Sequence, residues 1–116
     1  MNEHLFNTLR ELAKDSTLSQ RDLSQKMGLS LGRVNYIVNA LVEKGYIKAE
    51  RFKNSKNKMA YMYILTPKGV KEKIMQTQMF LTQKSEEFER LKQEIDMLRI
   101  EDALTRKHVN AFHDQE

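Results

Sequence analysis

The sequence has no cysteine, no tryptophan, a single proline and only four glycines, and it contains no long apolar run. Without cysteine the chain cannot form disulfides, use a thiolate in catalysis or bind zinc through sulfur. So few prolines and glycines argue against an all-β sandwich with its many turns. A membrane-spanning helix needs about 20 apolar residues, and residues 1–4 do not begin a secretory signal peptide. We therefore expect a cytoplasmic protein with no membrane partner.

The charges that the sequence does contain are unevenly distributed. Residues 1–66 hold 11 Lys and Arg against 6 Asp and Glu, whereas residues 67–116 hold 9 against 10. A basic half beside a balanced half is typical of a chain whose first part binds nucleic acid. A modest positive charge that merely aids solubility is the alternative interpretation.

The first part of the sequence predicts two helices. Apolar residues recur at helical spacing through residues 3–14, which indicates the first helix. Ser19 followed by Asp22 has the spacing of a capping box, and Gly28 supplies the left-handed residue that ends many helices. We therefore expect a second, short helix over about residues 19–27.

A third helix is expected to begin after Ser30, a favourable N-cap residue, and to end with Gly45 as its C-cap. The side chains that we expect it to bury are Val34, Ile37 or Val38, Leu41 and Val42. Two short helices joined by a turn at residues 28–30 form a helix-turn-helix pattern.

Two strands and a long helix complete the predicted order. Residues 46–52 and 60–65 are rich in β-forming side chains, and the polar, basic residues 53–58 between them indicate a hairpin turn. Thr66 and Pro67 are suited to the N-cap and first position of a further helix. Because no later proline interrupts it, this helix could run unbroken from 67 to about 105, a length of roughly 58 Å.

The fold class that follows is mainly α with a small β-hairpin: a winged helix-turn-helix followed by a long C-terminal coiled-coil helix. We expect the winged helix-turn-helix domain to occupy residues 1–66 and a dimerisation helix to occupy residues 67–109. Residues 110–116 are expected to be a frayed tail.

In such a domain the third helix fits the DNA major groove, and its N-terminal residues meet base edges. Arginine can bind guanine through two donors, asparagine can pair with adenine, and glycine lets the backbone approach closely. The residues that we expect to contact bases are Gly32, Arg33, Asn35, Tyr36 and Asn39. Those that we expect to contact phosphates, at helix N-termini and the hairpin tip, are Gln20, Arg21, Ser30, Lys53, Lys56 and Lys58. The expected partner is therefore double-stranded DNA.

Catalytic and metal sites find little support in the sequence. It has no glycine-rich phosphate loop and no nucleophile motif. Its histidines are His4, His108 and His113, and the last two are five residues apart, on different faces of a helix. No cysteine completes a metal site. We expect no enzyme, no metal and no cofactor.

The long helix carries an apolar residue at every seventh position from Ile74 to Ile95, and these residues define position a of a heptad. Thr77 and Lys84 weaken the stripe at the earlier d positions, and Asp102 ends it. The residues that we expect at a dimer interface are Leu81, Phe88, Leu91, Ile95 and Leu98. The alternative interpretation is a stripe that packs on its own domain.

The charges that flank this stripe predict the orientation of a dimer. The residues at positions g and e are, respectively, Glu87, Glu94 and Glu101, and Lys92, Arg99 and Arg106. A parallel pair of helices sets g against the following e and joins opposite charges, whereas an antiparallel pair joins like charges. Each exposed pair contributes about 0.2–1 kcal/mol, which is enough to choose an orientation. We expect a parallel homodimer.

Residues 18–28, 30–35 and 41–47 resemble the MarR family of bacterial winged-helix transcription regulators. The resemblance is closest to a short subgroup associated with exopolysaccharide (EPS) gene clusters, and its most discriminating stretch is Ser-Leu-Gly-Arg-Val-Asn-Tyr at 30–36. Further subgroup-like stretches are 57–58, 61–63, 65–69, 80–81 and 94–95. The resemblance implies a DNA-binding regulator of polysaccharide biosynthesis genes in a Gram-negative bacterium.

The sequence departs from larger members of that family in two places. Their wing carries an Asp-Arg-Arg-like element, whereas residues 52–58 here are Phe-Lys-Asn-Ser-Lys-Asn-Lys, so an arginine in the groove is not carried over. They also have helices at both ends that build a ligand pocket, so we do not expect a small-molecule effector. The alternatives to a DNA-binding regulator are a protein-interaction module without specific DNA binding and, more weakly, an RNA-binding winged helix.

Overall fold

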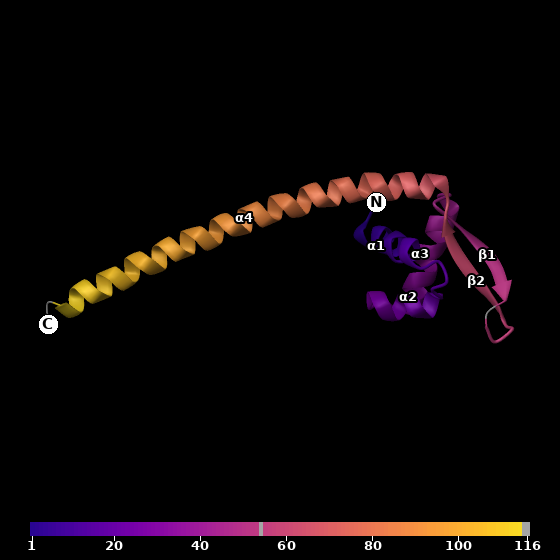
Figure 1. Cartoon of the computed structure of the whole chain (residues 1–116), viewed down its shortest axis with the longest axis horizontal. Coiled ribbons are helices and arrows are strands. Elements are labelled where there is room, and N and C mark those ends of the chain that lie inside the picture. Colours follow the sequence, from indigo (N-terminus) through magenta and orange to yellow (C-terminus); the bar gives the residue numbers. More distant parts are fainter. Residues whose placement is uncertain (54, 115–116) are drawn as a thin grey trace. The chain divides into compact units, whose positions relative to one another are not determined.

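The computed structural model describes residues 1–53 and 55–114, and for residues 113 and 114 it describes the backbone alone. Within that part of the chain the elements are, in order, α1 (Glu3–Lys14), α2 (Gln20–Met27), α3 (Leu31–Glu43), β1 (Ile47–Lys53), β2 (Met59–Leu65) and α4 (Pro67–Asp114) (Figure 1). The chain forms two compact units, residues 1–78 and the chain from residue 79 onward. The mainly α class, with a hairpin and a long C-terminal helix, is confirmed.

Hydrogen bonds at the helix ends explain why the caps could be predicted. The Ser19 hydroxyl accepts a bond from the Asp22 N–H at 3.0 Å, and the Asp22 carboxylate accepts one from the Ser19 N–H at 2.9 Å. Gly28, with φ at +66°, then ends α2. The Ser30 hydroxyl accepts the Arg33 N–H at 3.1 Å, which begins α3. These bonds satisfy donors that a helix N-terminus would otherwise leave unpaired.

The end of α3 differs from the sequence prediction by one residue. Lys44 is the C-cap, and Gly45 follows it in the left-handed region with φ at +77°. The Gly45 N–H donates to the Val42 carbonyl, and the Tyr46 N–H donates to the Leu41 carbonyl, which together form a Schellman motif. The prediction that Val42 is buried is wrong: 42% of it is exposed, because it lies about 100° around the helix from Leu41.

The core of the first unit lies among the three short helices and the base of the hairpin. Its buried members are Leu5, Leu9, Leu12, Leu18, Leu23, Val34, Ile37, Val38, Leu41, Ile47 and Tyr63. The side of α3 that contains Val34 and Leu41 faces this core, as the sequence predicted. Its opposite side is therefore turned to solvent.

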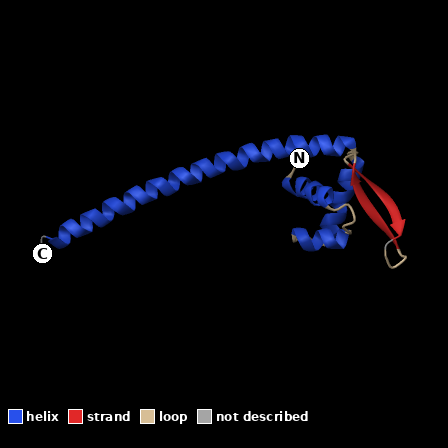
Figure 2. Ribbon diagram, viewed as in Figure 1, coloured by secondary structure: helices blue, strands red, loops and turns tan. Residues whose placement is uncertain are grey.

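The two strands form one antiparallel hairpin, drawn in red in Figure 2. In its register Ile47 lies opposite Leu65 and Lys53 lies opposite Met59. Lys53, which we placed in the turn, belongs to β1, and Asn54 lies outside the described residues. The Tyr63 N–H also donates to the Ser16 carbonyl at 3.1 Å. This bond fastens β2 to the loop between α1 and α2.

The start of α4 is fixed against the end of α3. The Thr66 hydroxyl donates to the Gly45 carbonyl and accepts the Gly69 N–H, so it caps α4 and holds the Schellman turn at once. A Cβ atom at Gly69 would lie 1.9 Å from the Tyr46 carbonyl oxygen. Only glycine permits this approach, which brings the first turn of α4 against the residue that follows the Schellman turn.

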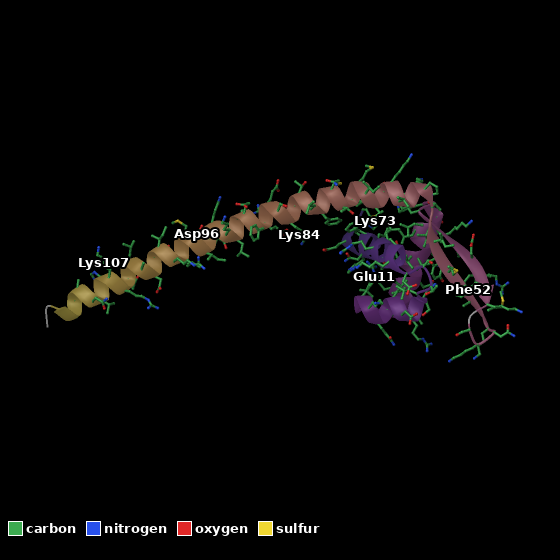
Figure 3. All side chains as sticks on the ribbon, in the orientation of Figure 1. Glu11, Phe52, Lys73, Lys84, Asp96 and Lys107 are labelled. Carbon is green, nitrogen blue, oxygen red and sulfur yellow. The ribbon has the colours of Figure 1, made fainter. Side chains whose placement is uncertain are left out.

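The helix α4 continues further than we predicted. We expected the helix to end at 109 and residues 110–116 to be frayed, whereas α4 extends through Asp114. No proline or glycine follows Gly69 in the sequence, so no residue interrupts the backbone hydrogen bonds. From Leu81 to Phe112 every side chain is exposed (Figure 3). Among the described residues, no helix combines the length and apolarity that crossing a membrane requires.

Replacement of Leu41 by alanine tests the inner side of α3. Leu41 is fully buried, so Leu41→Ala should lower the free energy of unfolding by about 2–5 kcal/mol in urea denaturation. Val42→Ala is the matched control, because this neighbouring residue is 42% exposed and its replacement should cost well under 1 kcal/mol. Equal losses in the two variants would mean that α3 is rotated differently.

Two glycines should respond to alanine in opposite directions. Gly69→Ala places a methyl group against the Tyr46 carbonyl and should destabilise the protein by about 1–3 kcal/mol. At Gly32, in α3, a Cβ atom would meet nothing within 4 Å. Gly32→Ala should therefore stabilise the protein by up to about 1 kcal/mol, because alanine favours helix. Thermal unfolding of both variants measures the difference, and a stable Gly69→Ala would contradict the close approach.

Candidate nucleic-acid interface

The solvent-facing side of α3 is polar. The predicted base-contacting residues, all exposed on this side, are Gly32, Arg33, Asn35, Tyr36 and Asn39. They alternate with the buried Val34, Ile37 and Val38. Packing of the apolar side of α3 against the core therefore leaves its polar side facing solvent. Ser30 stands at the beginning of the same helix and is exposed as well.

Near the N-terminus of α3, an aromatic ring supports the arginine. The Arg33 guanidinium lies 5.7 Å from the centroid of the Tyr36 ring, one turn further along, and Tyr36 is 66% exposed. A cation–π contact of this kind narrows the range of orientations of the guanidinium while leaving its donors accessible. A Cβ atom at Gly32 would meet nothing within 4 Å, so the backbone in the first turn of α3 is accessible from solvent.

The N-terminus of α2 already holds a negative charge of its own. The Ser19 N–H and the Ser19 hydroxyl hold the pKa of Asp22 below its ordinary value, so the carboxylate is charged at neutral pH. It occupies the place where the helix dipole would favour a phosphate. Arg21 beside it is exposed and can reach a phosphate with its side chain.

A chain of side-chain amides joins α3 to α2 and to the hairpin. Asn39 Nδ2 donates to Asn35 Oδ1 at 3.1 Å, and Asn35 Nδ2 donates to Gln20 Oε1 at 3.2 Å. Gln20 Nε2 in turn donates to the Tyr63 hydroxyl at 3.2 Å. Gln20, which we predicted to contact a phosphate, is therefore half-buried with its amide directed at protein groups.

The hairpin places its positive charges at the tip. The three predicted wing contacts, Lys53, Lys56 and Lys58, are exposed. Closer to the base of the hairpin, the Lys48 ammonium lies 2.7 Å from the Glu50 carboxylate, and the Arg51 guanidinium lies 5.9 Å from the centroid of the Tyr61 ring. Three exposed lysines therefore lie at the end of β1 or beside the turn, whereas the Lys48 charge near the base is paired with a carboxylate.

An open groove of about 640 Å³ lies between the helix-turn-helix and the hairpin. Its lining residues are Thr17, Ser19, Gln20, Arg21, Leu31, Gly32, Asn35, Ala60, Tyr61 and Tyr63. Sequence reasoning missed the contribution of Thr17, Leu31 and β2, because residues from three distant segments build the groove. The groove borders both Arg21 and the N-terminus of α3.

In the second unit, the apolar stripe of α4 is exposed. The predicted interface residues, each between 42% and 62% exposed, are Leu81, Phe88, Leu91, Ile95 and Leu98. Asp102 and Thr105 occupy the a and d positions that follow, where we expected the stripe to end, and Val109 and Phe112 occupy those of the heptad after them. Asp102 itself pairs with Arg106 at 3.0 Å within the chain. Figure 3 labels Lys84, Asp96 and Lys107 as side chains that project from this helix.

Where the chain is described, no group of three or more His, Cys, Asp or Glu side chains is arranged to hold a metal ion. Two carboxylates of the first unit, Asp15 and Asp22, instead lie at helix ends, where the Thr17 hydroxyl and N–H lower the pKa of Asp15 and Ser19 lowers that of Asp22. The chemical groups that α3 and the hairpin offer are amides, guanidinium groups and ammonium groups. These are donors and acceptors suited to base edges and phosphates.

Residues 1–48 match the family model described as "Winged helix-turn-helix DNA-binding". The match covers α1, α2, α3 and the first residues of β1. Among proteins of curated function, none matches the sequence.

Several solved structures are similar to the chain. A MarR/EmrR family transcriptional regulator from Acinetobacter sp. ADP1 is 23% identical, with a TM-score of 0.65, and the match covers 95% of this chain and 77% of that one. Streptococcus pneumoniae FabT in complex with DNA is 21% identical, with a TM-score of 0.57 and coverage of 74% and 59%. Staphylococcus aureus MarR in complex with salicylate and kanamycin is 22% identical, with a TM-score of 0.56 and coverage of 73% and 57%. These likenesses show the winged helix-turn-helix fold.

Proposed function

We propose that the protein is a sequence-specific, double-stranded DNA-binding transcriptional regulator that acts as a homodimer. The observation that carries the proposal is the polar side of α3, where Arg33, Asn35 and Asn39 are exposed in the same domain as the basic hairpin. In winged helices the corresponding helix enters the major groove, and the flanking elements hold the backbone. The match of residues 1–48 to a DNA-binding model and the likeness to a protein solved with DNA support this function.

The homodimer rests on the exposed stripe of α4. Helices in proteins gain most of their stability from packing an apolar side, and from Leu81 to Phe112 every described side chain of α4 is exposed. Each large apolar side chain contributes about 1.5–3 kcal/mol when fully buried. A second copy of the same stripe is the simplest surface that buries these residues at heptad spacing.

The parallel orientation rests on the flanking charges. Glu87 would face Lys92 of the second copy, and Glu94 would face Arg99, whereas an antiparallel dimer would bring like charges together. The third predicted pair competes with the bond between Arg106 and Asp102 within each chain. A parallel dimer carries two winged helices to half-sites about one or more DNA turns, roughly 34–36 Å each, apart.

For the target genes, we propose genes of exopolysaccharide biosynthesis. The support is the resemblance of residues 30–36 and the other subgroup-like stretches to regulators associated with EPS clusters. Selection of genomic fragments by the purified protein tests this directly. Recovery of fragments upstream of glycosyltransferase or polysaccharide-export genes would support the proposal, and recovery upstream of unrelated genes would contradict it.

Replacement of Arg33 tests sequence-specific recognition on the selected fragment. If Arg33 binds a base through two donors, Arg33→Ala should weaken binding to that site by about 1–3 kcal/mol and change binding to random DNA much less. Fluorescence anisotropy over a range of salt concentrations measures both affinities.

Lys56→Ala is the comparison, because a phosphate contact should be lost equally on both DNAs and should reduce the salt dependence. If Arg33→Ala shows equal losses, Arg33 contacts a phosphate rather than a base. If the wild-type protein binds every DNA equally weakly, the protein-interaction alternative is favoured over a specific regulator.

A cysteine at Leu98 tests the parallel dimer. Leu98 occupies a d position, and in a parallel pair each d residue faces its own copy. Leu98→Cys should therefore form a disulfide-linked dimer under mild oxidation, seen on a non-reducing gel.

Met97→Cys is the matched control, since Met97 is 57% exposed against 62% for Leu98 but occupies position c, outside the a and d stripe. Only Leu98→Cys should cross-link efficiently. A protein that sediments as a dimer while Leu98→Cys stays monomeric on the gel would contradict the parallel arrangement.

A further inference from the structure

The beginning of α4 packs on its own domain through one side of the helix. Within the first unit, Gly69 and Gln76 are buried, and Glu72 and Lys73 are half-buried. Gly69 lies against the Tyr46 carbonyl, just after α3. These four residues of α4 occupy positions c, f and g of the heptad, so the side that packs on the domain is not the side that carries the apolar stripe.

The apolar stripe begins before the residues that we assigned to the dimer interface. Val70 and Ile74 occupy the d and a positions that precede Leu81. They lie about 100–160° around the helix from Gly69 and Gln76. Accordingly, Val70 is 46% exposed and Ile74 is 57% exposed. Packing on the first unit therefore does not account for this part of the stripe.

Thr77 occupies the d position between Ile74 and Leu81, where we expected it to weaken the stripe. Its hydroxyl donates to the Lys73 carbonyl at 2.6 Å, within the same helix. The hydroxyl therefore needs no partner from a second chain, and the methyl group of Thr77 is free to face an apolar surface. The a and d residues from Val70 to Leu81 can consequently form one continuous surface.

A second apolar pair lies on another side of the same turns, but it has no continuation along the helix. Met75 and Met79, at positions b and f, are 59% and 53% exposed. The residues at the next b and f positions are polar: Thr82, Glu86, Glu89 and Gln93. The side that carries Val70 and Ile74 instead continues at heptad spacing into the proposed dimer stripe. Continuity with that stripe identifies the occupant of this side as a second copy of the chain.

We infer that the dimer interface begins at Val70 and Ile74, within the first unit, and thereby fixes the distance between the two DNA half-sites that the dimer binds. The inference rests on the proposed homodimer and its DNA-binding function. Thr66 and Gly69 hold the start of α4 against the end of α3. Two copies joined in the next turns of α4 therefore hold their α3 helices in one arrangement. A dimer joined only from Leu81 onward, about two turns later, would allow several spacings, because α4 can bend before the contact begins.

Disulfide trapping tests where the interface begins. The sequence has no cysteine, so a single introduced thiol reports its own position. Ile74→Cys should form a disulfide-linked dimer under mild oxidation, because residues at position a face each other in a parallel pair. Met75→Cys is the matched control, since Met75 is 59% exposed against 57% for Ile74 but occupies position b. Cross-linking through Leu98→Cys but not through Ile74→Cys would overturn the inference and leave the proposed homodimer standing.

Sedimentation equilibrium measures how much this contact contributes to the dimer. Ile74→Ala should raise the dimer dissociation constant about tenfold or more, the effect of losing one large apolar side chain from the interface. Met75→Ala should change the dissociation constant by less than about twofold. Because both side chains are exposed within their own chain, neither change should disturb the fold of the first unit. Equal dissociation constants for the two variants would overturn the inference.

DNA sites with different spacings test the functional consequence. A site selected by the purified protein is lengthened by about five base pairs, or half a turn, between its half-sites. The wild type should then lose about 100-fold or more in affinity, because only one half-site can be bound. At concentrations where Ile74→Ala is dimeric, its loss should be smaller, and a loss equal to that of the wild type would overturn the inference. Cross-linking through Ile74→Cys together with a wild type that binds all DNA alike would instead refute the proposed function and leave the interface standing.

Discussion

The burial of one side of α3 is the constraint on which the rest of the domain depends. Val34, Ile37, Val38 and Leu41 are held in a core shared with α1, α2 and the base of the hairpin. Successive residues in a helix are about 100° apart, so this packing fixes the rotation of α3 to within a fraction of a turn. This rotation determines which side chains of α3 face solvent and are available to the proposed DNA partner. The hydroxyl caps and the Schellman turn then fix its position along the axis.

The sequence was sufficient for the elements whose causes are local. Caps such as Ser19 and Ser30 act over three residues, so the beginnings of α2 and α3 could be predicted from spacing alone. Errors arose where the deciding neighbour was distant or the signal was weak. Val42 sits at the margin of the apolar side, and no local rule decides on which side of that margin it falls. The end of α4 lacks any stop residue that could mark it.

The site was predictable as a list of exposed residues but not as a network. Arg33 and Asn39 could be assigned to a solvent-facing side because helical period is a local property. The bond from Gln20 to Tyr63 joins residues 43 positions apart, and no spacing rule anticipates such a contact. The same holds for Gly69, whose close approach to Tyr46 depends on how α3 and α4 meet. Side-chain networks of this kind appear only when the fold is assembled.

The base of the hairpin packs in the core, whereas the residues near its turn are exposed. The two parts should therefore differ in how well they tolerate substitution. Tyr63 and Ile47 belong to the core, so substitutions there disturb the whole domain. The lysines near the turn are exposed and lie outside the core. Changes at the tip, in length or in charge, should therefore alter how tightly the proposed DNA complex forms at a given salt concentration. Such changes should leave the base contacts proposed for α3 unchanged, because the core fixes the rotation of that helix.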